Sequence, residues 1–469
     1  MPTKAQARLK VFNPATGKIV TALDADDRSS VKEKFLAARA AQPKWAKRPV
    51  SERVAILQRF RESLVSEADT LAVTLTTEVG KPIRQSRNEL KGVLGRIDFF
   101  LKEAPRVLRP ETVFKEKNAD GTQLGERITQ EPLGVIANIS AWNYPYLVGS
   151  NVIVPALLAG NAVLYKPSEF ATLTGLGIAR LMHAAGVPQD VFAPLVGGGE
   201  VGGALLRQPV DGVFFTGSYA TGKKIARAVA GRMIKLQLEL GGKDPIYICD
   251  DVADIAQVAA GVADGAFYNA GQSCCSVERI YVQEKIFEEF VAAFVAEVKT
   301  YRMGDPRSEE TYLGPLTRAP QLAVLESQIA DARRKGARVL LGGKRRKGRG
   351  NYFEPTVVVD VDHTMAMMRD ESFGPIIGLM SVKTDAEAVA LMNDTAYGLT
   401  AGVYAAKRSR AEKILAQVKS GSAYWNCCDR VSPRLPWSGL GASGIGLTLS
   451  RAGIATFTRP KAWHLKSPE

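Results

Sequence analysis

From residue 134 onward, short apolar runs alternate with segments of helical spacing, and this alternation is the feature that most constrains the fold. Strands are expected at 135–139, 162–165, 191–196, 213–216 and 236–240, with helices such as 172–185 and 221–231 between them. Repeated βαβ units predict a parallel, doubly wound sheet, in which ligands collect at the carboxyl ends of the strands.

A second alternating section follows the glycine pair Gly241 and Gly242. It predicts strands at 246–249, 279–282, 376–381 and 400–404 and a helix at 254–268. Because a chain of 469 residues is too long for one hydrophobic core, we expect an α/β fold with two doubly wound domains.

Three segments lie outside these two sections. Apolar residues at spacings of three and four predict one amphipathic helix over 51–78, which Gly80 and Pro82 end. The polar segment 113–132 is either a hairpin or a loop, and 462–465 alternates as an edge strand would.

Composition excludes several classes of protein. Apolar residues make up 46% and charged residues 23% of the chain, which is ordinary for a globular protein. No apolar region follows the basic start MPTKAQARLKVF, and the apolar stretch 148–165 is interrupted by Asn and Pro, so neither a secretory signal nor a membrane-spanning helix is expected. The 5 cysteines lack C-x-x-C spacing and only 3 histidines occur, which predicts reduced thiols, a cytoplasmic location and no metal site.

A formal charge of +14 raises the question of nucleic-acid binding. The basic residues are scattered, however, and the one dense run, KRRKGR at 344–349, lies between glycines where a surface loop is expected. No nucleic-acid partner is predicted.

Three segments contain residues suited to catalysis. Cys274 follows a Gly-Gln pair after a helical segment, where a bend could expose a nucleophilic sulfur, although buried inert cysteines are the alternative. Glu239 ends an apolar strand and is either a general base facing a cleft or a surface residue. Asn143 follows the first strand, where its amide could stabilise an oxyanion or simply form a turn.

Two further segments suit a phosphate. Ser218 follows the fourth strand and can cap a helix. The terminus of that helix either binds a phosphate or is simply capped by the serine. The glycine-rich stretch 196–203 follows the third strand and does not match the G-x-G-x-x-G fingerprint, so a conventional Rossmann dehydrogenase is not supported.

Together these segments resemble the aldehyde dehydrogenase superfamily over nearly the whole chain. The matching motifs, in the family's order, are FNPATG (12–17), TEVGKP (77–82), WNYP (142–145), KPSE (166–169), FTGS (215–218), ELGGK (239–243), GQSC (271–274) and ESFGP (371–375). One departure is Ala141, which stands where a proline often precedes the Trp-Asn pair.

The resemblance implies a role for each catalytic candidate. Cys274 matches the nucleophile, and Asn143 matches the side-chain half of the oxyanion hole. Glu239 matches the general base that hydrolyses a thioester on Cys274. CoA-acylating relatives lack this glutamate, so the resemblance implies oxidation of an aldehyde to a carboxylic acid. A non-catalytic protein that kept the fold would be expected to lack one of the three residues.

The resemblance also implies the binding residues. A nicotinamide dinucleotide would contact Ile139, Ser140, Trp142, Lys166, Ser168, Glu169, Gly199, Gly203, Phe215, Gly217, Ser218, Leu240, Glu371 and Phe373. NAD is expected and NADP is possible, because a carboxylate at 169 repels the 2′-phosphate of NADP.

The substrate channel would be an apolar, partly aromatic tunnel for uncharged aldehydes. Arg430 and Arg434, which could instead hold a substrate carboxylate, are expected to be solvated. The expected lining is Tyr144, Leu147, Ser273, Cys275, Asp429, Val431 and Trp437.

The family fold further implies three parts in this chain. These are a dinucleotide-binding domain (1–112 and 133–241), a catalytic domain (242–445) and a β oligomerisation element (113–132 and 446–469). A homodimer or homotetramer is expected.

Overall fold

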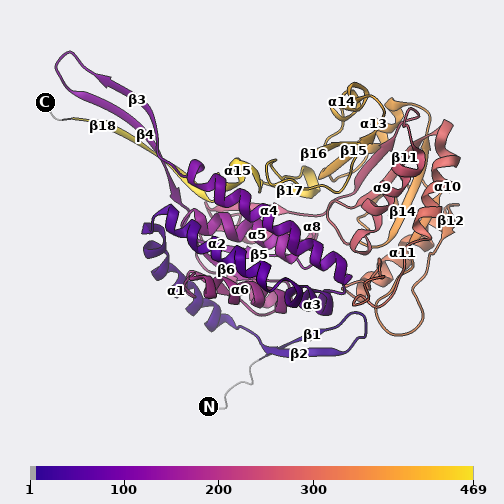
Figure 1. Cartoon of the computed structure of the whole chain (residues 1–469), viewed down its shortest axis with the longest axis horizontal. Coiled ribbons are helices and arrows are strands. Elements are labelled where there is room, and N and C mark those ends of the chain that lie inside the picture. Colours follow the sequence, from indigo (N-terminus) through magenta and orange to yellow (C-terminus); the bar gives the residue numbers. More distant parts are fainter. Residues whose placement is uncertain (1–6, 468–469) are drawn as a thin grey trace.

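The structure is a computed structural model that describes residues 7–467 (Figure 1). The first six residues of the predicted dinucleotide-binding domain, which also begin the segment judged not to be a secretory signal, lie outside the described residues. So do residues 468–469 of the predicted oligomerisation element.

The first domain is built on a sheet of order β17-β9-β8-β5-β6-β7. All neighbouring strands are parallel except β17 and β9, so the doubly wound sheet has one antiparallel edge. The strands are β5 (Val135–Ile139), β6 (Ala162–Lys166), β7 (Phe192–Pro194), β8 (Gly212–Thr216), β9 (Lys235–Glu239) and β17 (Gly444–Ile445). The predicted strand at 191–196 is shorter than expected, since it pairs only with residues 163–165 of β6.

Helices cover both faces of this sheet. On one face α1, α7 and α8 pack against alternate residues of β5, such as Val135 and Ala137, and the remaining helices pack against the other face. The helices are α1 (Arg28–Lys47), α2 (Val50–Ser66), α3 (Ala68–Val79), α4 (Ile83–Val107), α5 (Pro145–Leu158), α6 (Thr172–Ala185), α7 (Gly199–Leu206) and α8 (Tyr219–Val229).

The prediction of one helix over 51–78 is wrong. Glu67 leaves the helical conformation (φ −107°, ψ 13°) and separates α2 from α3. The apolar spacing runs across this break because both helices bury a face in the same core, which contains Leu64 and Leu71.

The second domain is built on a sheet of order β12-β13-β14-β11-β10-β15-β16, in which only the β12–β13 pair is antiparallel. Its strands are β10 (Asp244–Ile248), β11 (Val277–Gln283), β12 (Arg338–Leu341), β13 (Thr356–Val359), β14 (Ile376–Val382), β15 (Thr400–Tyr404) and β16 (Ser422–Trp425). Its helices are α9 (Ile255–Phe267), α10 (Phe287–Val298), α11 (Pro320–Arg334), α12 (Ala366–Arg369), α13 (Asp385–Asn393) and α14 (Arg408–Leu415), with short 3₁₀ turns at Tyr268–Gly271 and Glu284–Ile286. The two predicted parallel-sheet domains are therefore confirmed.

A third, antiparallel sheet of order β18-β4-β3 projects away from the first domain (Figure 1). It consists of β3 (Glu111–Lys117), β4 (Gln123–Pro132) and β18 (Thr458–Lys466), so the segment 113–132 is a hairpin and 462–465 lies in a strand. A 3₁₀ turn (Gly441–Ser443) and α15 (Ser450–Ala455) lead to β18, and β1 (Arg8–Phe12) and β2 (Ile19–Asp24) form a separate hairpin. Among the described residues, no helix is long and apolar enough to cross a membrane.

Candidate active site

Cys274 lies just after a sharp bend that follows α9. Asn269, Ala270 and Gly271 have positive φ values of 54°, 55° and 69°, so the chain leaves the helix direction within three residues. A Cβ on Gly271 would lie 2.4 Å from the carbonyl oxygen of Gly374, which requires glycine there. The bend leaves the Cys274 side chain partly exposed on a cavity wall, whereas Cys275 is buried.

The polar side chains of Asn269 and Gln272 hold this bend. Asn269 Nδ2 donates to the Gln272 carbonyl at 3.2 Å, and Gln272 Nε2 donates back to the Asn269 carbonyl at 3.0 Å. The backbone N–H of Thr317 donates to Gln272 Oε1 at 2.9 Å, which ties the bend to a distant segment. The segment that contains Cys274 is therefore fixed from two sides.

Asn143 follows β5 and lies next to the cysteine segment. Its side chain is 4% exposed, and its Nδ2 donates to the Gln272 carbonyl at 3.1 Å. The structure thus brings the Asn143 amide beside the segment that carries Cys274, although the two are far apart in sequence.

Glu239 ends β9 as a buried residue, 6% exposed, and is not the surface residue that the sequence left possible. Its Oε1 accepts hydrogen bonds from Gln237 Nε2 at 2.8 Å and Thr448 Oγ1 at 3.5 Å, while its Oε2 has no partner among the described residues. Burial raises the pKa of the Glu239 carboxyl well above its ordinary value. A buried carboxyl of raised pKa with one free oxygen has the properties of a general base.

The chain after Glu239 passes directly against the nucleophile. A Cβ on Gly242 would lie 2.5 Å from the carbonyl oxygen of Cys274, so only glycine allows this approach. The Gly241–Gly242 pair, which separates the two predicted domains, thus packs the end of β9 against the Cys274 segment.

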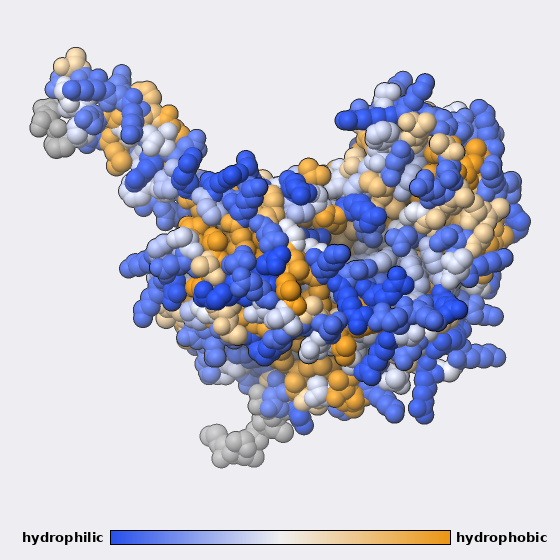
Figure 2. All heavy atoms as spheres, in the orientation of Figure 1, coloured by the Kyte–Doolittle hydropathy of each residue, from blue (hydrophilic) through white to orange (hydrophobic). Residues whose placement is uncertain are grey.

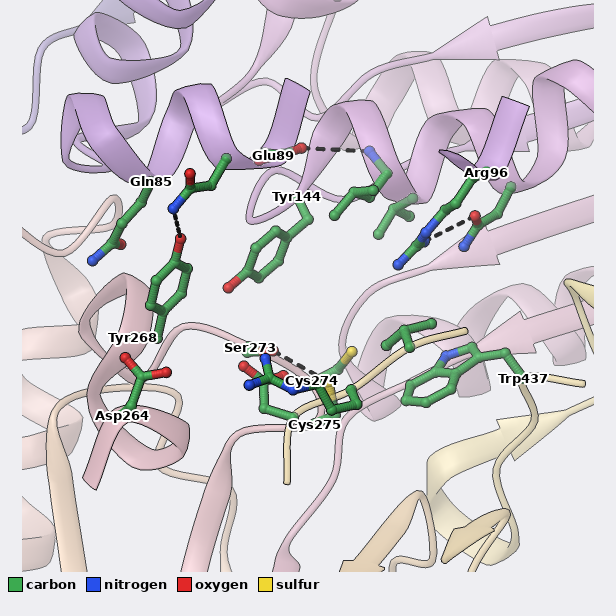
Figure 3. Close-up of a pocket in the computed structure, with 17 residues that line it drawn as sticks. Gln85, Glu89, Arg96, Tyr144, Asp264, Tyr268, Ser273, Cys274, Cys275 and Trp437 are labelled. Carbon is green, nitrogen blue, oxygen red and sulfur yellow. Dashed lines mark hydrogen bonds between the residues drawn. The ribbon is translucent and has the colours of Figure 1, made fainter. Parts of the chain in front are cut away.

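A cavity of about 380 Å³ opens beside Cys274 (Figure 3). All the residues predicted to form the substrate channel line it: Tyr144, Leu147, Ser273, Cys275, Asp429, Val431 and Trp437. The sequence analysis missed the other lining residues apart from Arg430, namely Gln85, Asn88, Glu89, Arg96, Val148, Asn151, Asp264 and Tyr268. A signal was present in α4, where Gln85, Glu89 and Arg96 are polar residues on a helix face that otherwise buries apolar ones.

The cavity lining is more apolar than polar, as predicted for the channel, but charged side chains also line it. Charged side chains from three segments line it: Glu89 and Arg96 from α4, Asp264 from α9, and Asp429 from the loop after β16. Of the two arginines considered from the sequence, Arg430 lines the cavity and is exposed, whereas Arg434 is exposed and is not part of the lining.

The residues predicted to bind the dinucleotide lie mainly along the carboxyl edge of the first sheet. Ile139, Ser140 and Trp142 lie at the end of β5, and Lys166, Ser168 and Glu169 lie at the end of β6. Phe215, Gly217 and Ser218 lie at the end of β8, and Leu240 directly follows β9. Gly199 and Gly203 belong to α7. Glu371 and Phe373 come from the loop before β14 and meet this edge. Phe373 contacts the Trp142 ring edge-on, with centroids 5.5 Å apart, and Glu371 accepts a hydrogen bond from Gly242 N at 3.1 Å.

This edge can accommodate a dinucleotide. Open space surrounds the position that a Cβ of Gly199 would occupy at the start of α7, so a phosphate can approach the backbone there. Ser218 caps α8 by accepting a hydrogen bond from Thr221 N at 3.4 Å, and the buried Lys166 lies 3.6 Å from Glu169. Among residues 7–467 no cluster suited to a metal ion occurs, and all five cysteines are free thiols.

The chain matches the aldehyde dehydrogenase family over residues 2–463. The chain therefore belongs to the aldehyde dehydrogenase family, as its motifs indicated.

Named relatives and solved structures agree with this assignment. A protein of Mycobacterium ulcerans (strain Agy99), provisionally named an NADP(+) succinate-semialdehyde dehydrogenase, is 35% identical over 448 residues, which cover 94% of this chain and 86% of that protein. Betaine aldehyde dehydrogenase of Cereibacter sphaeroides (strain ATCC 17029 / ATH 2.4.9) is 34% identical over 464 residues, covering 98% and 94%. The crystal structure of lactaldehyde dehydrogenase from Escherichia coli superposes with a TM-score of 0.93 at 31% identity, covering 99% of this chain and 96% of that one.

Proposed function

We propose that this protein oxidises an aldehyde to the carboxylic acid with NAD, through a covalent intermediate on Cys274. The observation that carries the proposal is the position of Cys274, partly exposed on the cavity wall and packed against the segments of both Asn143 and Glu239. The overall reaction consumes aldehyde, NAD and water and gives carboxylate, NADH and protons.

The side chains divide the reaction into two chemical stages. The Cys274 thiolate attacks the aldehyde carbon and forms a thiohemiacetal, while the Asn143 amide and the Cys274 backbone N–H donate to the oxyanion. When bound, the nicotinamide supplies the hydride acceptor that converts the thiohemiacetal into a thioester. Glu239 then takes a proton from water, the resulting hydroxide attacks the thioester carbon, and the carbon–sulfur bond breaks to release the acid.

Lys166 and Glu169 would bind the adenosine ribose, Ser218 the pyrophosphate, and Glu371 and Phe373 the nicotinamide riboside. Because the Glu169 carboxylate repels a 2′-phosphate, we propose that NAD is preferred over NADP. The Mycobacterium ulcerans relative is named as an NADP(+) enzyme, and for this reason both cofactors belong in the assay.

The CoA-acylating reaction is the alternative within the family. Glu239 argues against it, because a buried general base is needed for hydrolysis and not for transfer to a thiol.

We further propose that the projecting β18-β4-β3 sheet joins subunits into a homodimer or homotetramer. Its residues Val113, Phe114 and Leu465 are 49%, 42% and 47% exposed, and Figure 2 shows apolar side chains among the charged ones along this sheet. Exposed apolar residues on a sheet with open edges favour association. The free thiols suit the reducing cytoplasm, where we place the protein.

The test is NADH formation, measured by absorbance, with the full-length protein, either cofactor and a panel of aldehydes. We expect Cys274→Ala to abolish turnover, while the control Cys427→Ala retains it, because Cys427 is also a partly exposed thiol but does not line the cavity. If the Cys274→Ala protein remains active, covalent catalysis by Cys274 is wrong.

A further inference from the structure

One end of the cavity contains a buried arginine. Arg96 belongs to α4, is 8% exposed and lies with Trp437 on one side of Cys274, whereas Asp264 and Tyr268 lie on the other side (Figure 3). Trp437 is itself buried, so the Arg96 end is enclosed. The opposite end includes the exposed Asn88, whose side chain donates to the Tyr268 hydroxyl at 3.1 Å.

The guanidinium of Arg96 has few partners. Its Nη1 donates to Asn151 Oδ1 at 3.0 Å, and within residues 7–467 this is its only hydrogen bond, with no carboxylate in an ion pair. Burial lowers the pKa of Arg96 to about 10, so the side chain still carries its charge at neutral pH. Glu89 favours the charged form of Arg96 but is itself paired with Lys81, so the unused N–H donors of the buried guanidinium need an acceptor.

Two other buried arginines show what structural arginines of this protein look like. Arg53 donates to four backbone carbonyl groups around the end of α1 and α5. Arg279 donates to three backbone carbonyl groups and to the Tyr281 hydroxyl. Arg96 lacks such a set of acceptors, which distinguishes it from arginines that only stabilise the fold.

The carboxylates of the cavity already have partners. Glu89 forms a buried ion pair with Lys81, and Asp429 accepts a hydrogen bond from the Cys275 thiol at 2.9 Å. Asp264 accepts from a tyrosine hydroxyl at 2.6 Å. The one strongly buried charge without a partner in this cavity is therefore positive.

We propose that Arg96 and Asn151 bind a carboxylate of the substrate, so that the substrates are aldehydes with an acidic group at the end remote from the carbonyl. This inference rests on the proposed function, in which Cys274 receives the aldehyde carbon in the same cavity. The guanidinium donates to the carboxylate oxygens, and the Asn151 amide N–H groups remain available because its Oδ1 faces Arg96. The prediction of uncharged aldehydes is replaced by this one.

The experiment compares succinate semialdehyde with butanal, which has the same chain length and no charge. For the wild-type protein we expect kcat/KM to favour succinate semialdehyde by at least about tenfold. Arg96→Gln should raise KM for succinate semialdehyde about 100-fold, the loss expected for charge-assisted hydrogen bonds, and change KM for butanal less than about threefold.

Arg96→Lys keeps the charge but lacks the planar guanidinium, so its KM for succinate semialdehyde should lie between those of the wild-type protein and Arg96→Gln. Arg434→Gln is the matched control, because Arg434 is exposed and does not line the cavity, and it should leave the preference unchanged. Calorimetric titration of the cofactor-free wild-type protein and of Arg96→Lys with succinate measures anion binding without catalysis. It tests whether Arg96 binds a carboxylate even if Arg96→Gln does not fold.

Equal effects of Arg96→Gln on both aldehydes, or a wild-type preference for butanal or for the cationic betaine aldehyde, would overturn the inference. Oxidation of butanal without a preference for the carboxylate contradicts this inference alone. Failure to oxidise any aldehyde contradicts the proposed function itself.

Discussion

Replacing Glu239 by glutamine removes the general base with little change of shape. The glutamine carbonyl oxygen can still accept the hydrogen bond that Gln237 Nε2 donates to Glu239 Oε1 at 2.8 Å, so the packing of β9 is preserved. The variant should form the thioester on Cys274 at a normal rate and hydrolyse it slowly. NADH should therefore appear in a burst of about one equivalent per site, followed by a slow steady state.

The size of the effect follows from the environment of the carboxyl. A positioned general base contributes roughly 10²–10⁴-fold, which corresponds to about 3–5 kcal/mol of barrier height. The buried Glu239 has a raised pKa and acts only when deprotonated. At pH values below the raised pKa of Glu239, wild-type kcat should therefore fall by up to about tenfold for each unit by which the pH is lowered. The rate of the Glu239→Gln variant should not follow this profile.

The assay combines stopped-flow absorbance of NADH with intact-protein mass spectrometry. The mass of Glu239→Gln should increase by one acyl group during turnover, and the double variant Cys274→Ala/Glu239→Gln should show no increase. If kcat of Glu239→Gln stays within about threefold of wild type, or if no acyl adduct accumulates when kcat is low, Glu239 is not the base for hydrolysis.

Two further predictions test cofactor choice and stability. Glu169→Gln should raise the ratio of kcat/KM for NADP to kcat/KM for NAD by about tenfold, because it removes a negative charge facing the 2′-phosphate. An unchanged ratio would show that Glu169 does not set the preference for NAD. Burial raises the pKa of the Asp244 carboxyl from 3.8 to about 8. The free energy of unfolding that the buried, protonated carboxyl contributes is complete below the pKa of the unfolded state. This contribution is lost, at about 1.4 kcal/mol per pH unit, as the pH rises from there toward 8. Asparagine can keep both hydrogen bonds to Thr400, so Asp244→Asn should reduce the fall in melting temperature between about pH 5 and pH 8, which lies within the range of this loss, and a parallel fall in both proteins would contradict the argument.

The sequence predicted the central strands well because they are buried on both faces. β5, β6 and β10 are buried at every position and therefore read as continuous apolar runs. The strands β12, β13 and β16 of the second sheet were not predicted. β12 and β16 lie at the edges of the sheet and alternate half-buried with exposed residues, whereas β13 is buried at every position and its short apolar run was missed.

The catalytic candidates were accessible from motifs, whereas the charge of the cavity was not. Cys274, Glu239 and Asn143 each follow a recognisable strand or helix end, and the topology of the sheets brings their segments together. Arg96 is a polar residue on the buried face of α4, and Asn151 lies in an otherwise apolar helix, so the sequence shows both polar positions but not that they meet. Their meeting depends on how α4 packs on α5, which a single sequence does not reveal.

The bend at 269–271 connects the fold to the chemistry. Two consecutive residues other than glycine, Asn269 and Ala270, adopt the left-handed conformation, which costs about 1–2 kcal/mol per residue. Such a conformation persists only where surrounding contacts require it, and here the hydrogen bonds of Asn269 and Gln272 and the close approach of Gly374 do so. The bend, and not a continuation of α9, leads the chain to Cys274 and to the contact of Gln272 with Asn143. In the proposed mechanism, this strain lies next to the sulfur atom whose position determines the reaction.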